Sequence, residues 1–242
     1  MAKNRRKKYL LILSLKNMNM ETTNAKQEII IELQYFPPIS YFTLITPFNN
    51  IQIEAFEHFK KQSYRNRCLI NGANKIEKLI VPVKHSMSQT NIRDIHIDYS
   101  TNWFNNHTRA ILSAYGKSPF YEHFAEDFLN IINKKHHFLF DLNLEILSKC
   151  LELLEINPGF SFAEKYEKPA ISGVFDAREL IDPKKPDKKN KFFRPAPYYQ
   201  VFGKNFVEDL SILDLIFCEG PNAMYIIRQS VLSGKRRKTD LY

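Results

Sequence analysis

The run EIIIEL at residues 28–33 is the first predicted element of secondary structure in this chain. The fold class depends on which elements follow it. Isoleucine is enriched in β-strands, and the two prolines at residues 37–38 make a rigid turn soon afterwards, so we expect a strand here. Residues 50–56 alternate apolar and polar side chains, which predicts a second, half-buried strand. Further β-like runs follow at residues 63–70, 78–83 and 92–97. The first hundred residues are therefore predicted to be rich in strands.

The middle of the chain has the spacing of helices. Trp103, His107, Ile111 and Ala114 recur on one helical face, which predicts a helix that ends before Ser118-Pro119. Two more helices are predicted, one from about residue 119 through 131 and one from about residue 141 to the Pro-Gly pair at 158–159.

Shorter elements are predicted at both ends. Pro38 can occupy the first position of a short helix that runs to residue 45. Residues 183–191 are rich in proline and lysine, and we expect a mobile loop there. A closing strand is predicted at residues 198–202 and closing helices at residues 210–217 and 222–232.

The order of these elements predicts one mixed α/β domain, with α+β as the alternative. A chain of 242 residues can bury a sizeable core in one domain. The pattern does not determine the order of the strands. We expect residues 1–19 to be a non-structural basic leader, residues 20–232 the folded domain and residues 233–242 a basic tail.

The chain is basic, with a net charge of +9 at pH 7. Much of this charge lies in the first 17 residues and in residues 235–238, and such runs are usually solvated tails. We therefore expect no nucleic-acid partner. The apolar run at residues 9–15 is short for a signal peptide, and Met18 or Met20 can be the true start.

Three widely separated cysteines argue against a disulfide framework. They are typical of a protein in the reducing cytoplasm, where we expect this chain to be located. No segment approaches the ~20 apolar residues of a membrane span.

Arg65 and Arg67 are the sharpest local feature. In a strand over residues 63–70 they would lie on one face, where two guanidinium groups can grip a phosphate or a carboxylate. The alternative is an exposed strand whose arginines are solvated or paired with Glu54 or Glu57. Cys68 would point away from them, which favours a buried structural cysteine over a nucleophile.

Several other polar residues have two interpretations, one functional and one structural. His107 can act as a general base or can be a core histidine bonded to the backbone. Asp214 follows Ser211 by three residues at the start of an apolar run, so helix capping competes with ligand binding. Tyr198, Tyr199 and Gln200 can line a pocket edge or be ordinary strand residues.

The sequence lacks the usual signals of metal and nucleotide sites. His123, His136 and His137 have no ligand-like spacing, so we expect no metal site. The chain contains no G-x-S-x-G, no P-loop and no G-x-G-x-x-G motif, which disfavours common hydrolases, kinases and dehydrogenases.

The chain contains six short motifs between residues 35 and 221. They are YFPP at 35–38, YRNRC at 64–68, WFNNH at 103–107, YYQVF at 198–202, LSILD at 210–214 and GP at 220–221. Together they resemble the WbqC-like family, over about residues 32–225. Many members have a Gln-Pro pair ahead of the first motif. Here LQYFPP at residues 33–38 lacks that proline, so a ligand loop at this position would differ.

The family is usually met in bacterial surface-polysaccharide gene clusters and has been suggested to include glycine transferases. The resemblance therefore implies a transferase that moves an aminoacyl or acyl group onto a polysaccharide precursor, from an anionic small-molecule donor to a sugar acceptor, without a cofactor. It implies His107 and Lys117 as catalytic residues. The implied substrate-binding residues are Tyr35, Arg65, Asn66, Arg67, Trp103, Tyr199, Gln200 and Asp214. The alternative is a non-catalytic binding or assembly protein of envelope biogenesis.

Overall fold

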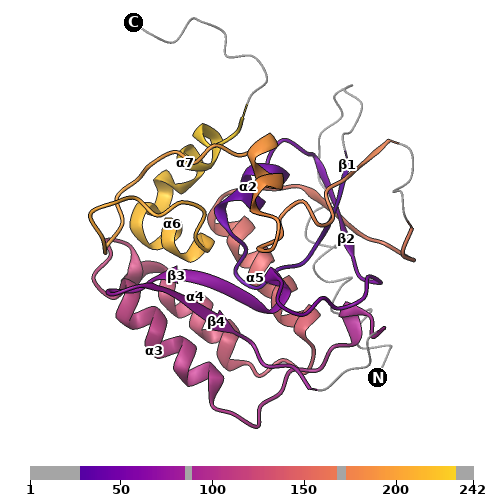
Figure 1. Ribbon diagram of the computed structural model, residues 1–242, viewed down its shortest axis with the longest axis horizontal. Helices are drawn as coiled ribbons and strands as arrows, with labels where there is room; N and C mark the ends of the chain where they lie inside the picture. Colours follow the sequence, from indigo (N-terminus) through magenta and orange to yellow (C-terminus); the bar gives the residue numbers. More distant parts are fainter. Residues whose placement is uncertain (1–27, 85–88, 168–172, 233–242) are drawn as a thin grey trace, which may run out of the picture.

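A parallel sheet organises the computed structural model, which describes residues 28–84, 89–167 and 173–232 (Figure 1). Its four strands have the order β5-β2-β1-β6, and every neighbouring pair is parallel. The strands are β1 (Glu28–Glu32), β2 (Asn50–Glu54), β5 (Gly159–Phe162) and β6 (Val174–Asp176). The predicted α/β class is confirmed. The proposed leader and tail lie outside the described residues.

The two central strands explain why an isoleucine run opens the fold. Ile29, Ile30 and Ile31 are all buried, although successive side chains point to opposite faces of the sheet. A strand that is covered on both faces needs a continuous apolar run, as is usual in parallel sheets. Helix α2 (Ile39–Ile45) connects β1 to β2, because parallel neighbours need a crossover.

An antiparallel hairpin forms a second, two-stranded sheet. It consists of β3 (Arg67–Asn71) and β4 (Ile76–Ile80). The connecting turn begins at Asn71-Gly72, a pair typical of hairpin turns, and the backbone N–H of Gly72 donates to the carbonyl of Lys75 at 3.1 Å. Helices α3 and α6 both contact β3, so β3 holds the hairpin against the helical part of the molecule, while β4 is mostly exposed (Figure 1).

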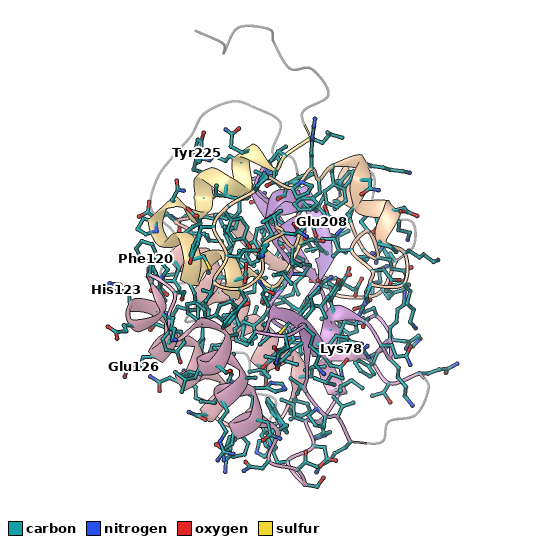
Figure 2. The ribbon with its side chains drawn as sticks, turned by 60° about the vertical axis from the view of Figure 1, so that its left-hand side comes forward. Lys78, Phe120, His123, Glu126, Glu208 and Tyr225 are labelled. Atoms are coloured by element: carbon teal, nitrogen blue, oxygen red, sulfur yellow. The ribbon has the colours of Figure 1, made fainter. Side chains whose placement is uncertain are left out.

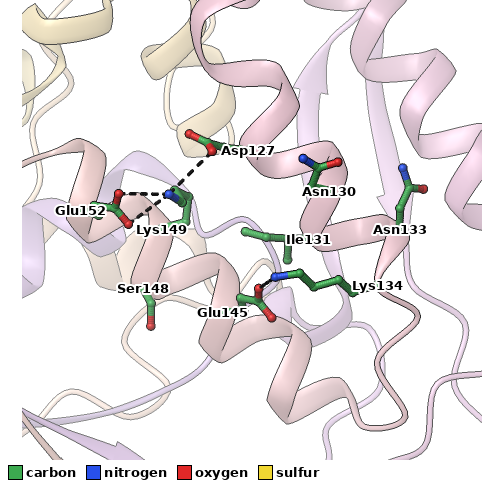
Figure 3. Close-up of a pocket in the computed structure, with 9 residues that line it drawn as sticks. All are labelled: Asp127, Asn130, Ile131, Asn133, Lys134, Glu145, Ser148, Lys149 and Glu152. Carbon is green, nitrogen blue, oxygen red and sulfur yellow. Dashed lines mark hydrogen bonds and ion pairs between the residues drawn. The ribbon is translucent and has the colours of Figure 1, made fainter. Parts of the chain in front are cut away.

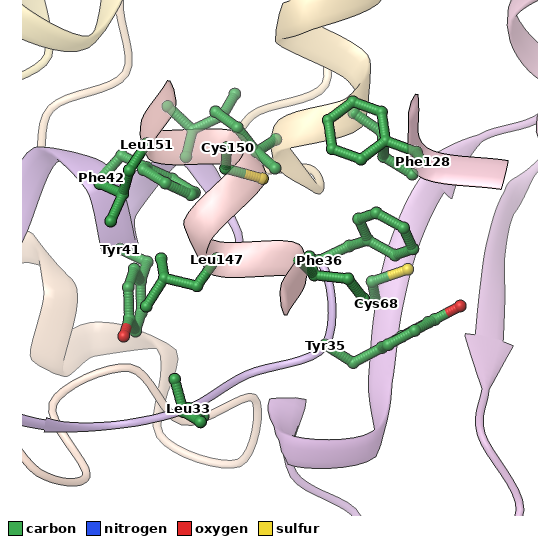
Figure 4. Close-up of a cluster of buried hydrophobic side chains, with 14 of the residues drawn as sticks. Leu33, Tyr35, Phe36, Tyr41, Phe42, Cys68, Phe128, Leu147, Cys150 and Leu151 are labelled. Carbon is green, nitrogen blue, oxygen red and sulfur yellow. The ribbon is translucent and has the colours of Figure 1, made fainter. Parts of the chain in front are cut away.

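Helices enclose the core, as their apolar spacing predicts. The longer ones are α3 (Trp103–Tyr115), α4 (Tyr121–Asn133) and α5 (Leu139–Leu153), followed by α6 (Ile212–Glu219) and α7 (Ala223–Gln229). The described residues also contain four 3-10 turns, of which the last connects α6 to α7: η1 (Tyr64–Asn66), η2 (Ile92–Asp94), η3 (Pro186–Lys191) and η4 (Gly220–Asn222). Helix α5 carries Leu147 and Cys150 into a core shared with Tyr35, Phe36 and Phe128 (Figure 4). No helix in the described ranges is both long and apolar enough to cross a membrane.

Three predicted strands are wrong, in whole or in part. Residues 64–66 form η1, so the strand begins only at Arg67. Residues 92–94 form η2, and residues 198–202 belong to no strand. At the last site the backbone is held by a side chain, since Gln200 bonds both the N–H and the carbonyl of Val207. Local β-propensity was outweighed in each case by tertiary contacts.

Two strands, β5 and β6, were not predicted from the sequence. Pro158-Gly159 looked like a helix stop, but Gly159 also begins β5, and β6 has only three residues. Strands this short offer almost no periodic signal. Within the segment predicted as a loop, residues 186–191 form η3.

Gly220 offers a test of the core packing. Its φ is +50°, and an added Cβ would lie 2.5 Å from Cδ1 of Phe120. We expect Gly220→Ala to lower the free energy of unfolding by about 3 kcal/mol, through backbone strain and overpacking. Gly203→Ala is the matched control, because Gly203 has φ +92° but its nearest neighbour would be 3.5 Å away. Equal losses in urea denaturation of the two variants would rule out the packing contribution.

Candidate functional site

Two carboxylates lie side by side at the carboxyl ends of the central strands. Glu32 is the last residue of β1, Glu54 is the last residue of β2, and the two are partners in the strand register. Both are fully buried. In open parallel sheets, ligands bind beyond this edge, so buried acids here are candidates for function.

Arg65 reaches the same edge from η1. Its Nε donates to Oε1 of Glu57 at 2.6 Å and its Nη2 to Oε2 at 2.5 Å, which is a bidentate pair. Oε1 of Glu32 lies 3.8 Å from the same Nη2. Although burial opposes it, the charges of Glu32 and Glu57 raise the pKa of Arg65 above its usual value. The guanidinium is therefore a permanent cation surrounded by acids.

Glu57 is the acid whose protonation is most affected by this setting. Burial raises its pKa to about 7, the Arg65 guanidinium works against that rise, and Glu32 adds to it. A buried carboxyl group with a pKa close to neutrality can accept and release a proton under ordinary conditions.

A second arginine completes the arrangement. Arg178 follows β6 and donates from Nη1 to Oε2 of Glu54 at 2.7 Å. Its Nε and Nη2 bond both oxygens of Asp176, at 2.9 and 2.7 Å. We call the six residues the carboxyl-edge cluster: Glu32, Glu54, Glu57, Arg65, Asp176 and Arg178.

A small hollow lies near this cluster, although none of the six cluster residues lines it. Its volume is about 50 Å³, and Tyr64, Lys185, Lys189 and Asp209 are among its lining residues. Ile181 also lines it and connects it to the cluster, because Nε2 of Gln34 donates both to the Ile181 carbonyl and to Oε1 of Glu32. The hollow is large enough for one chemical group and too small for a whole nucleotide-sugar.

The predicted anion clamp does not form in this structure. Because η1 replaces the predicted strand, Arg65 is buried against Glu57, as in the alternative reading, while Arg67 lies half-buried in β3. Asn66 donates its amide to the carbonyl of Val81. Cys68 faces the core, and burial raises the pKa of its thiol.

His107 lies in the core between two hydrogen-bond partners. Its Nδ1 is 2.9 Å from Oη of Tyr35, and its ring also bonds the Ile80 carbonyl. The Trp103 ring packs against it at a centroid distance of 5.0 Å. Burial lowers the pKa of His107 to about 4, so the ring is neutral at physiological pH.

Asp214 and Gln200 form a third group. The carboxylate of Asp214 is fully buried in α6 and accepts hydrogen bonds at Oδ2 from Oη of Tyr198 (2.5 Å) and Nε2 of Gln200 (2.9 Å). Burial raises the pKa of Asp214. Ser211 caps α6, as predicted, because its hydroxyl accepts from the N–H of Leu213.

The predicted site residues thus fall in separate places. Arg65 belongs to the carboxyl-edge cluster, whereas Tyr35, Trp103 and His107 belong to the core. Lys117 and Tyr199 are exposed. The sequence analysis missed Glu32, Gln34 and Arg178, and it considered Glu54 and Glu57 only as partners for an arginine. The sequence did contain one signal for Glu32: a glutamate at the end of an isoleucine-rich strand indicates a charged group at the edge of the sheet.

A larger hollow lies elsewhere, between α4 and α5 (Figure 3). It has a volume of about 700 Å³, and its acids are paired with lysines: Glu145 with Lys134, and Asp127 and Glu152 with Lys149. Side-chain hydrogen bonds, from His136 first and then Lys134, lower the pKa of Glu145 to about 2. No aromatic side chain lines this groove, so it lacks a platform for a sugar ring or base.

The described residues contain no group of three or more histidines, cysteines or acids that could hold a metal ion. His123 is exposed on the outer side of α4 near Glu126 (Figure 2). Nε2 of His136 is 3.0 Å from Oε2 of Glu145.

The buried His107 predicts a specific loss of stability in acid. Because its pKa is about 4 in the folded protein and about 6.5 in an unfolded chain, the stabilisation is complete above pH 6.5 and falls as pH drops towards 4. We expect it to amount to roughly 3 kcal/mol. Urea denaturation at pH 7, 5.5 and 4 should show a shallower decline for His107→Gln than for the natural protein. Parallel declines would contradict a buried neutral His107.

Comparison with known proteins supports the resemblance over the first three of the six motifs, whereas the motifs at residues 198–202, 210–214 and 220–221 lie beyond the matched range. A model of the WbqC-like protein family matches residues 34–178, which is more than half of the chain and includes Glu54, Glu57, Arg65 and Arg178. No curated protein and no solved structure matches the chain. The chain belongs to the WbqC-like protein family.

Proposed function

We propose that the chain is a cytoplasmic transferase that moves an acyl or aminoacyl group onto a sugar precursor of a surface polysaccharide, with Glu57 as its acid–base group. The observation that carries the proposal is the position of Glu57. It is a buried carboxyl group with a pKa near neutrality, located beyond the carboxyl ends of parallel strands. The family resemblance supplies the substrate class, and three buried free cysteines support the location.

In this reaction Glu57 would remove the proton from the acceptor hydroxyl or amine. The freed electron pair forms the new bond to the acyl carbon, and the bond to the donor's leaving group breaks. The leaving group carries away the electron pair, and Glu57 can return the proton to it. Arg65 holds the Glu57 carboxylate by two hydrogen bonds and so fixes its orientation.

This assignment moves the base from His107 to Glu57. The His107 ring is buried in the core, where its Nδ1 pairs with Oη of Tyr35 and the ring also contacts the Ile80 carbonyl. In this proposal His107 orders the packing of α3 against the hairpin. Arg65 keeps a functional role in this proposal, because its two hydrogen bonds orient the Glu57 carboxylate.

The alternative function is a non-catalytic binding or assembly protein of envelope biogenesis. One observation favours it. Glu57 and Arg65 are only 4% and 3% exposed, and the nearby hollow of about 50 Å³ is far below the ~300–1,000 Å³ of typical ligand pockets. A polar cluster sealed in this way can be purely structural.

Glu57→Gln separates the two functions. We would test the full chain against nucleotide-sugars, coenzyme A thioesters, amino acids and aminoacyl carriers, using thermal shift for binding and mass spectrometry for transfer. We expect the natural protein to bind one donor class. The variant should still bind it but transfer at least about 100-fold more slowly, because the base is lost.

Glu145→Gln, in the groove between α4 and α5, is the control and should transfer normally. Undiminished transfer by Glu57→Gln would remove Glu57 from the chemistry. A well-folded natural protein that responds to no ligand in the panel would favour the binding or assembly function.

A further inference from the structure

A lysine-rich segment covers the carboxyl-edge cluster. Residues 179–191 follow β6 directly, and the N–H of Glu179 donates to Oε2 of Glu32 at 3.1 Å. The Ile181 carbonyl accepts from Gln34, which also bonds Glu32. We call residues 179–191 the lysine strap. Its first turn therefore lies directly over the buried end of β1.

Both ends of the strap are firmly anchored. On the amino side, Arg178 bonds Glu54 and Asp176, and the N–H of Ala177 donates to the Ile30 carbonyl. On the carboxyl side, Phe193 is buried and forms a β-bridge with Val231. A segment held at its two ends can move between them without unfolding the domain.

The strap itself buries little. Ile181 is the only one of its residues that is buried, and η3 within it has no buried side chain. Segments with few buried apolar contacts open at a lower free energy than the core does. Glu179 has φ +66°, a strained conformation for a residue with a side chain, at the point where the strap leaves its anchor.

Polar contacts between lysines and oxygen atoms hold the strap closed. Lys60 forms an ion pair with Glu179, and Nζ of Lys184 donates to the Lys61 carbonyl at 3.3 Å. Nζ of Lys189 is 2.6 Å from Oδ2 of Asp209. The side chain of Lys60 is 44% exposed, so its ion pair with Glu179 is weak. The Lys189–Asp209 pair is largely buried and is the stronger of the two contacts.

We propose that the lysine strap is a lid that opens between its anchors at Arg178 and Phe193 and gives a small-molecule substrate access to the carboxyl-edge cluster. The ligand side of this proposal rests on the proposed function, because a substrate has to reach Glu57. Closure explains why the nearby hollow holds only about 50 Å³. The lysines that leave their oxygen partners on opening become available to an anionic group of the entering molecule.

A charge exchange at the Lys60–Glu179 pair tests the lid without any ligand. Lys60→Glu places two acids together and should speed hydrogen–deuterium exchange of the peptide spanning residues 178–191 by roughly fivefold. The double variant Lys60→Glu/Glu179→Lys restores an opposite-charge pair and should return exchange to the natural rate. Peptides from α5 should exchange equally in all three proteins.

Lys134→Glu is the matched control, because Lys134 pairs with Glu145 in a similarly exposed setting between α4 and α5. It should leave exchange of the strap unchanged. Unaltered strap exchange in Lys60→Glu, or an increase that extends equally to α5, would overturn the lid. Because no substrate is used, this outcome is independent of whether Glu57 proves catalytic.

Discussion

Charge compensation at the carboxyl edge of the sheet constrains the rest of the structure. Glu32 and Glu54 end the two central strands and are fully buried, so each needs a positive or hydrogen-bonding partner. Removing one member of a buried ion pair typically costs about 3–5 kcal/mol. The partners come from segments distant in sequence, Arg65 from η1 and Arg178 from the end of β6. The sheet edge therefore fixes the path of both segments.

This constraint explains the least regular part of the chain. The 3-10 turn η1 directs the Arg65 side chain inwards, and Nδ2 of Asn143 in α5 donates to the Arg65 carbonyl at 2.7 Å. The same turn fixes the start of the hairpin, which α3 and α6 then pack against. A strand through residues 63–66 would have exposed the arginine to solvent and left Glu57 without its partner.

The sequence supports prediction of the elements whose burial has a clear period. The spacing of Trp103, His107 and Ile111 predicts α3, and the isoleucine run predicts β1. Neither η1 nor β6 has such a period, because their positions depend on ion pairs between distant segments, Arg65 with Glu32 and Arg178 with Glu54. For the same reason Arg65 could be identified as a site candidate, while its neighbours Glu32 and Arg178 could not. A residue's partners across the fold are not encoded in local spacing.

The composition of the cluster favours the proposed proton-handling role over a purely structural network. Three buried carboxylates, Glu32, Glu54 and Glu57, face two guanidinium groups, whereas Asp176 is partly solvated. A network selected only for stability has no need of a surplus buried acid, since an apolar residue of similar volume would cost less. The surplus charge is relieved when one carboxyl group carries a proton, and Glu57, with its raised pKa, is the group that does so. In the proposed mechanism, a proton held at this covered sheet edge reaches a substrate only when the lysine strap opens.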